Sequence, residues 1–428
     1  MMKIEMFPAS YGDSFLISCN GKTTTNILID MGFMSTYTNS IKNKLTEVKS
    51  KGESISLLVF THIDEDHIAG GLKFLSENGK IENPNIVEIE NIWFNSYRHI
   101  QFWKSDFEAD ESDVKNDSVL ESIIGKGRPR EKGNRDVQSV GAMQGSTLAS
   151  LMYFNEYMNI WNRDFEYSAV TVEEILDNGV DNLRKITIND EVGITVLSPD
   201  ENKLKQLETV WQEKLASAGY SKQIVSSKLM DDAFEIYTTN INSENPKLRK
   251  LYKVSSEKEE TEIKNSLTNP FEADTTEVNG SSIAFILDFD GKRVLFLGDS
   301  HPDIIIKNLK IIKSAWNCER LWFDAVKISH HGSKHNTSVE LLELIDSDKF
   351  IFSTNGRGKG FSHPDIETVY RVIATPNSKK KSLIFNYRPL HIISKIDKEE
   401  FKEKYNFEIK YTNDLSKSIN NKNTTIIL

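Results

Sequence analysis

The chain has 428 residues, 38% of them hydrophobic and 27% charged, so it is long enough to bury one large core or two modest ones. Its 53 basic and 63 acidic side chains give a formal charge of −10, which excludes broad electrostatic capture of nucleic acid and leaves only local groups to meet a polyanion. There is no apolar stretch of the kind that secretory signals and membrane spans require, and the only cysteines are Cys19 and Cys318. We therefore expect a cytoplasmic protein whose metals, if it binds any, are held by His and carboxylates.

Alternating apolar and polar residues open the chain and predict an antiparallel meander. Its three short strands are expected at residues 2–7, 14–19 and 26–30. Helices are predicted over residues 36–51 and 69–78, and the continuous apolar runs 55–60 and 89–94 suit strands buried on both faces. This order is typical of a layered α/β architecture, so residues 1–96 are predicted to form the first half of a core.

Composition divides the rest of the chain into core segments and insertions. Residues 97–182 and the polar residues 217–276 are predicted to be insertions. Residues 183–216 and 277–375 return to a core pattern, and residues 376–428 are a predicted C-terminal extension. The expected strands are 183–188, 193–197, 281–289, 293–297, 325–328, 349–353 and 383–386, with a helix at 203–216 and an edge strand at 424–428.

The first chemistry-bearing cluster starts where the apolar run 55–60 stops. A turn after a buried strand lets neighbouring side chains point into one volume, which makes His62, Asp64, Asp66 and His67 a candidate site for divalent ions. Imidazole and carboxylate suit Zn²⁺, Mn²⁺ or iron, and the lack of thiolates favours an open catalytic site over a structural zinc. The alternative is an acidic loop that only favours a helix N-terminus, and it leaves both histidines unexplained.

Three later clusters also follow apolar strands. Asp299 is a candidate bridging carboxylate between two metals, although such a residue is also typical of a turn or a cap. One of His330 and His331 is expected to be a metal ligand and the other a supporting or phosphate-contact group, the alternative being two exposed histidines in a flexible loop. The Gly-rich loop 355–363 is expected to bring backbone N–H groups and His363 toward an anion, or to be a plain turn.

In this order the motifs resemble the metallo-β-lactamase superfamily. The resemblance is closest to its ComEC-type branch, the hydrolase domain associated with DNA-uptake proteins and its free-standing soluble relatives. It covers about residues 3–95 and 183–375. The matching motifs are Tyr11-Gly-Asp-Ser14, Ile27-Leu-Ile-Asp30-Met-Gly32, Thr61-His-Ile-Asp-Glu-Asp-His67-Ile-Ala-Gly-Gly71, Asn279-Gly-Ser-Ser-Ile283, Leu297-Gly-Asp299, Ser329-His-His-Gly-Ser333 and Asn355 through His363-Pro364.

The resemblance implies an α/β fold, an αβ/βα four-layer sandwich with two insertions and with metals at one edge of two facing sheets. Its ligands form two sets that share one carboxylate. They are His62 and Asp64 for the first metal, Asp66 and His67 for the second, Asp299 as the bridge, and His331, or else His330, to complete the second. Asp64 stands where many members have His, and residues 279–282 stand where most have another His. The cofactor is therefore expected to be one or two divalent ions, Zn²⁺ or Mn²⁺, with an oxygen-rich and weaker first site.

The function that this resemblance implies is a metal-dependent phosphodiesterase or nuclease acting through a metal-activated water. Its substrate would be DNA, RNA or a nucleotide. The predicted catalytic residues are Asp66, which orients the water, Asp299 and His363. The predicted donors to the phosphate are Asn279, Ser281, Ser333, Lys334 and Asn355.

Three alternatives stay open at this level. The same fold hosts hydrolases of esters, lactones, thioesters and amides, although the missing middle His disfavours them. A di-iron oxidoreductase would be expected to show Glu in place of Asp64. A non-catalytic, metal-stabilised module could bind a protein partner through the two insertions. No membrane partner is expected, and the resemblance also allows a role in bacterial defence.

Overall fold

The computed structural model describes residues 1–96, 99–100, 148–149, 151–172, 183–217, 256–357, 362–414 and 422–428. Most of the predicted insertion 97–182, and residues 218–255 of the predicted polar insertion, lie outside the described residues. Within the ranges that are described, no helix is both long and apolar enough to cross a membrane.

A six-stranded sheet is built mainly from the start of the chain. Its strands are β1 (Met2–Met6), β2 (Phe15–Asn20), β3 (Thr24–Ile29), β4 (Leu57–Val59), β5 (Ile92–Trp93) and β16 (Thr424–Ile427), in the order β16-β1-β2-β3-β4-β5. The first three pair antiparallel, which confirms the predicted meander. β3, β4 and β5 run parallel, so their C-terminal ends lie at the same edge of the sheet.

Helices cover one face of this sheet. They are α1 (Met34–Thr36), η1 (Tyr37–Ile41), α2 (Lys42–Ser50) and α3 (Glu65–Asn78). Helix α3 begins four residues before the predicted start at Ala69, because Glu65 and Asp66 are favourable in a first turn even though they break the apolar periodicity. The helix also packs tightly on the preceding loop, since a Cβ on Gly70 would lie 2.1 Å from the carbonyl oxygen of Met31. Asp66 and His67 are therefore helical residues, not loop residues.

An eight-stranded sheet faces the first. It has the order β15-β14-β13-β11-β9-β8-β7-β6, antiparallel from β6 to β9 and parallel from β9 to β15. Its strands are β6 (Lys185–Ile188), β7 (Val192–Ser198), β8 (Ala284–Phe289), β9 (Lys292–Phe296), β11 (Ala325–Lys327), β13 (Lys349–Phe352), β14 (Lys381–Tyr387) and β15 (Phe407–Asn413). A separate parallel pair consists of β10 (Leu321–Phe323) and β12 (Ile345–Ser347).

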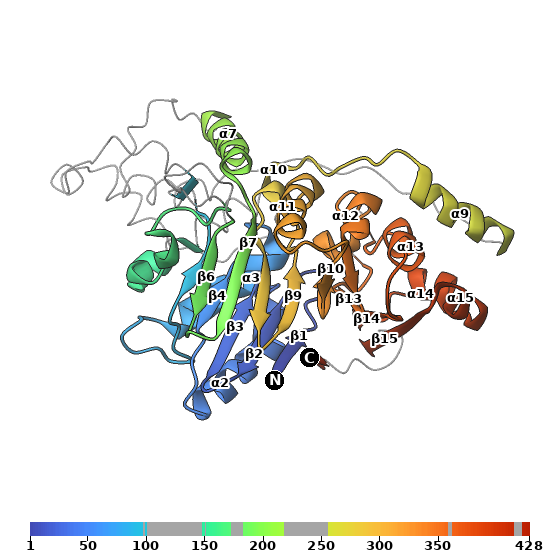
Figure 1. Cartoon of the computed structure of the whole chain (residues 1–428). Helices are drawn as coiled ribbons and strands as arrows, with labels where there is room; N and C mark the ends of the chain where they lie inside the picture. Colours follow the sequence, from blue (N-terminus) through green and yellow to red (C-terminus); the bar gives the residue numbers. More distant parts are fainter. Residues whose placement is uncertain are drawn as a thin grey trace.

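Further helices accompany the second sheet, and Figure 1 shows α11 to α15 gathered along it. They are α7 (Glu201–Ser217), α9 (Ser256–Thr268), α10 (Glu277–Gly280), α11 (Pro302–Ala315), α12 (Val339–Leu344), α13 (Ile366–Ala374), α14 (Leu390–Ile396) and α15 (Glu399–Tyr405). Short 3₁₀ turns are η4 (Tyr157–Asn159), η5 (Arg163–Phe165) and η7 (Ser329–Gly332). Helix α9 packs on α13, where Arg371 Nε donates to the Ser266 carbonyl at 2.9 Å. The end of the predicted polar insertion is thus part of the folded body.

Alternation along the strands divides the apolar side chains among three cores. On β2, Phe15 and Ile17 point into a core between the sheets, while Leu16 packs with the helices of the first sheet. On β9, Phe296 enters the same central core, and Leu295 packs with the helices of the second sheet. The layers are therefore helices, sheet, sheet and helices, which confirms the predicted α/β class.

The predicted C-terminal extension supplies edge strands to both sheets. β14 and β15 extend the second sheet, and β16 pairs antiparallel with β1, so the predicted edge strand at 424–428 is confirmed. The two chain ends accordingly lie close together in Figure 1.

Two neighbouring isoleucines of β16 test whether this strand stabilises the fold. Ile426 is 5% exposed in the central core, whereas Ile427 is 52% exposed. We expect Ile426→Ala to lower the free energy of unfolding by about 2 kcal/mol or more, and Ile427→Ala to change it by less than about 0.5 kcal/mol. Urea unfolding of both variants measures this, and equal losses would show that β16 does not pack as described.

Candidate metal centre

The polar side chains of the centre lie just beyond the C-terminal ends of strands, in loops or in the first turn of the following helix. His62 follows β4, and His67 lies in the first turn of α3 just beyond it. Asp299 follows β9, and His331 lies in η7 directly after β11. Since β9 and β11 run parallel, their ends meet at one edge, opposite the corresponding edge of the first sheet.

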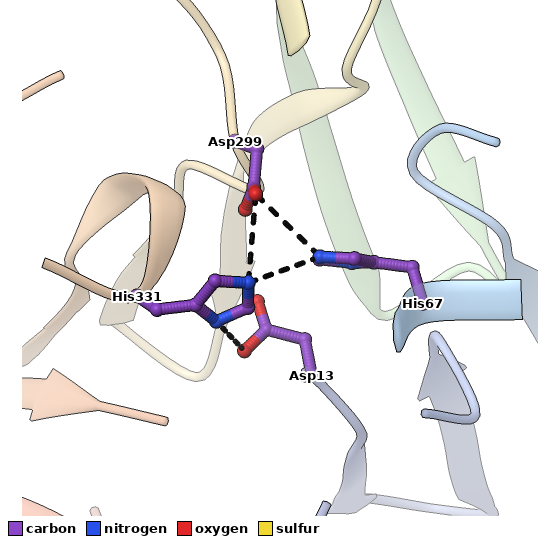
Figure 2. A group of neighbouring side chains, drawn as sticks. All are labelled: Asp13, His67, Asp299 and His331. Carbon is purple, nitrogen blue, oxygen red and sulfur yellow. Dashed lines mark hydrogen bonds and ion pairs between the residues drawn. The ribbon is translucent and has the colours of Figure 1, made fainter. Parts of the chain in front are cut away.

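Three ligand atoms form a nearly equilateral triangle (Figure 2). Asp299 Oδ2 lies 3.5 Å from His67 Nε2 and 3.5 Å from His331 Nε2, and the two nitrogens are 3.3 Å apart. Asp66 Oδ2 lies 3.4 Å from the same nitrogen of His331. A tetrahedral ion with N and O ligands at about 2.0–2.2 Å separates its ligand atoms by about 3.3–3.6 Å. The three side chains of the triangle therefore fit a divalent ion, and Asp66 lies next to one of them.

Acceptors behind the two imidazoles fix their orientation. His67 Nδ1 lies 2.8 Å from Asp30 Oδ2, and Asp30 is itself held by the backbone N–H of Thr61 at 2.8 Å. His331 Nδ1 lies 3.0 Å from the Ser353 carbonyl and 3.2 Å from Asp13 Oδ1. A protonated Nδ1 on each ring leaves the Nε2 lone pair facing the centre, as metal-ligating histidines require.

The turn that carries His330 and His331 has an uncommon backbone. Both residues have positive φ, 47° and 52°, and Gly332 follows at 93°. A non-glycine residue in this region costs about 1–3 kcal/mol, and such strain gathers at functional sites. The His330 N–H donates to the Gly298 carbonyl at 3.0 Å, which ties the turn to the residue just before Asp299.

Opposite charges in a buried space shift the pKa values of these groups. Burial alone would raise the pKa of Asp299, but the imidazoles of His331 and His67 hold it well below its usual range. Burial would lower the pKa of His331, but Asp299 and Asp13 raise it to about 10. The same balance, with Asp299 and Asp30 as the anions, raises the pKa of His67 well above its usual value. The metal-free centre thus holds protons where an ion would bind.

A second group of potential donors lies around His62. Its Nε2 is buried without a hydrogen-bond partner, 3.6 Å from Asp64 Oδ2 and 3.9 Å from Asp299 Oδ2. Asp64 stands at the N-cap of α3, yet its side chain makes no capping hydrogen bond. Ser282 Oγ lies 3.5 Å from His62 Nδ1 and accepts the Asp299 N–H at 3.0 Å. His62, Asp64 and the shared Asp299 offer three ligands, with wider spacings from His62 Nε2 than the triangle has.

His330 faces the centre from its more exposed side. Its Nδ1 lies 3.4 Å from Asp274 Oδ2 and 3.0 Å from Asn336 Oδ1, and its Nε2 lies 3.8 Å from Asp299 Oδ2. The predicted residue Asn279 joins this group by donating to Asp274 at 2.7 Å. The predicted residue His363 also lies here, its ring centroid 5.1 Å from that of His330.

The remaining predicted substrate donors make other contacts. Ser281 Oγ donates to the Val278 carbonyl at 2.6 Å, Ser333 Oγ accepts from the His335 N–H at 3.3 Å, Lys334 Nζ lies 3.6 Å from Glu367, and Asn355 Nδ2 donates to Ser10 Oγ at 3.1 Å. None of these side-chain contacts reaches the histidine cluster, so their role in substrate binding stays a prediction.

Sequence reasoning assigned no role at the centre to several residues that the structure brings to it. They are Asp13, Asp30, Asp274, Ser282, Lys327 and Asn336. The sequence pattern could have identified Asp30, since it follows an apolar strand as directly as the predicted ligands do. The pattern could also have identified Lys327, since a charged residue inside a buried strand needs a partner. No sequence pattern identifies Asp274, because it lies in a polar stretch that is typical of an insertion.

Lowering the pH should weaken ion binding, because protons and the ion compete for the same imidazole nitrogens. The pKa of His331 is raised to about 10, so binding displaces at least one proton throughout the neutral range. We expect the association constant for Zn²⁺ to rise by at least about tenfold per pH unit between about pH 6 and pH 8. Competition with a chromophoric chelator measures it, and a constant independent of pH would contradict this ligand set.

Comparison with known proteins identifies one part of the chain. Residues 8–134 match the family model of the Metallo-beta-lactamase superfamily. That stretch includes Asp13 and His67 but ends before Asp299 and His331, which the fold adds to the same centre. A search of curated proteins found no match. The match supports the superfamily, and with two facing, helix-covered sheets it places the chain in the α/β metallo-β-lactamase fold class.

Proposed function

We propose that the chain is a metal-dependent hydrolase that cleaves phosphodiesters in DNA, RNA or a nucleotide. The observation that carries the proposal is the triangle of His67 Nε2, His331 Nε2 and Asp299 Oδ2, with sides of 3.3–3.5 Å. Two imidazole nitrogens turned toward each other and toward one carboxylate oxygen suit a shared cation better than a set of hydrogen bonds. Zn²⁺ and Mn²⁺ are the ions that this mixed N and O set favours.

Each side chain has a definite part in this proposal. His67, His331, Asp66 and Asp299 would hold one ion, and His62 with Asp64 and the shared Asp299 would hold a second, weaker one. Bound ions would supply Lewis acidity, which lowers the pKa of water and stabilises negative charge on an attacked phosphate.

Asp66 is the proposed orienting group for the attacking water. Its side chain is 17% exposed, more than those of His67 and Asp299, so it lies at the solvent side of the triangle. This exposure allows it to contact a water that the deeper ligands cannot reach.

A phosphate fits the more open side of the centre. The His330 side chain is 24% exposed, and because Asp274 and Asn336 hold its Nδ1, its Nε2 remains directed at the centre. His363 lies beside it, with Nδ1 3.3 Å from Asp365 Oδ2. Two imidazoles backed by carboxylates are suitable donors to phosphate oxygens. The motifs shared with the ComEC-type branch favour the same substrate class.

The charge of the chain favours small or short substrates. At −10 the protein repels a polyanion at long range, so a long duplex would gain little from steering. We therefore expect faster cleavage of a nucleotide or a short single strand than of long duplex DNA at low ionic strength.

Loss of the shared carboxylate should abolish the activity. We expect Asp299→Asn to reduce hydrolysis of bis(p-nitrophenyl) phosphate by more than about a hundredfold, in the presence of Mn²⁺ or Zn²⁺, because it removes charge from both ion positions. The matched control is Asp303→Asn, four residues along the chain, where a 66% exposed side chain pairs with Lys203. It should retain the parent rate.

Rates with short DNA, short RNA and a cyclic dinucleotide would then rank the natural substrate classes. A parent protein that hydrolyses only esters or lactones would refute the substrate class but keep the hydrolase. A parent protein that binds no ion and cleaves nothing would refute the proposal as a whole.

The two ion positions should also differ in affinity. We expect Asp64→Asn to keep one tightly bound ion, because the triangle remains intact, and to weaken a second ion by about tenfold or more. Asp66→Asn should instead weaken the tighter ion. Isothermal titration with Zn²⁺ separates the two events, and equal loss of both ions in Asp64→Asn would show that the positions are not independent.

A further inference from the structure

A buried lysine lies beside the candidate metal centre. Lys327 is the last residue of β11, is 1% exposed, and forms an ion pair with Asp13. Its Nζ also donates to the Gly298 carbonyl at 3.1 Å and lies 3.8 Å from Asp299 Oδ1. A buried ammonium is costly unless it is paired, so this lysine and Asp13 hold each other in place.

The loop that carries Asp13 forms hydrogen bonds with α3 and with the residue that follows β13. The Asp13 N–H donates to the Asp66 carbonyl at 3.2 Å, and Ser353 Oγ donates to the Gly12 carbonyl at 2.8 Å. A Cβ on Gly12 would lie only 2.0 Å from the Asp66 carbonyl oxygen, so the approach requires glycine. The backbone of Asp13 is therefore held in place, and its side-chain rotamer decides which groups the carboxylate contacts.

Asp13 meets His331 on the far side of the ring from the triangle. Its Oδ1 lies 3.2 Å from Nδ1, whereas Nε2 of that ring faces His67 and Asp299 (Figure 2). Even so, Asp13 offers a ligand atom within 4.8 Å of those of His67, Asp299 and His331. By distance alone Asp13 would be a candidate metal ligand. Its contacts with Lys327 and with His331 Nδ1 argue against that role.

We propose that Lys327 keeps Asp13 away from the ion, so that Asp13 positions His331 and does not ligate. The inference rests on the metal centre of the proposed function. Lys327 pairs with Oδ2 of Asp13, and Oδ1 lies 3.2 Å from His331 Nδ1 in an ion-pair contact without a hydrogen bond. The ion would then be held by Asp66, His67, Asp299 and His331, with one negative charge fewer than the cluster offers. Without Asp13, a fifth coordination position would remain for water and substrate.

Two single variants and their double variant, each titrated with Co²⁺, test this assignment. The visible spectrum of bound Co²⁺ depends on its ligands and can be measured without turnover. Asp13→Asn should keep the band shape of the parent and bind Co²⁺ about tenfold more weakly, as expected for loss of a group that orients a ligand. Lys327→Met should free Asp13 to ligate, which weakens the absorption through higher coordination and tightens binding by about tenfold. The double variant should return to the parent band shape.

Lys381→Met is the matched control. Lys381 is a second buried lysine of the same sheet, 4% exposed on β14, and its Nζ donates to the carbonyls of Ile373 and Thr375. Its loss should lower stability without altering the Co²⁺ spectrum or affinity.

Three results would overturn the assignment, and they are distinguishable. A changed band shape in Asp13→Asn, like that expected for Asp66→Asn, would make Asp13 a ligand. An unchanged spectrum and affinity in Lys327→Met would show that the lysine does not restrain Asp13. No Co²⁺ binding by the parent would remove the proposed metal centre itself. Asp13→Asn keeps the assignment testable if Lys327→Met does not fold.

Discussion

One buried carboxylate organises the candidate centre. Asp299 is 2% exposed, and its Oδ2 lies within 3.9 Å of an Nε2 atom from each of four histidines, with Lys327 near its other oxygen. A charge in such a place is tolerated only because cations or protons surround it. Without an ion, that balance requires protonated imidazoles. The attraction between Asp299 and protonated imidazoles therefore stabilises the metal-free centre. A bound ion would displace those protons.

The fold meets this demand by bringing loops of two sheets to one place. His67 belongs to the first sheet's side and Asp299 to the second, so the triangle closes only when the central core has packed. Short contacts reinforce the junction, with Gly12 against the Asp66 carbonyl and Ser353 against the Gly12 carbonyl. The stretch that matches the superfamily contains one side of this arrangement only. The centre is therefore a property of the whole fold, and a variant that loosens the inter-sheet core would also loosen the ligands.

Much of this arrangement could be predicted from the sequence, because strand ends are visible as the points where apolar runs stop. That signal marked His67 and Asp299, and it marked the antiparallel opening strands. It failed at the start of α3, where Glu65 and Asp66 favour the helix N-terminus electrostatically but break the apolar pattern. It also failed for Asp274, whose partner His330 is distant in sequence, since long-range pairing leaves no local pattern. The roles of the predicted ligands themselves remain proposals that rest on geometry.

His330 and His331 show why residue identity alone does not assign such roles. The two histidines are adjacent, share a left-handed backbone, and both direct Nε2 toward Asp299. They differ in what meets Nδ1. Around His331 it is Ser353 and Asp13, deep in the fold, whereas around His330 it is Asp274 and Asn336, in a group with a more exposed ring. The buried ring is fixed on both sides and suits a ligand. In the proposed function the more exposed ring would contact substrate, so we propose that the partner at Nδ1 and the depth of the ring distinguish the two roles.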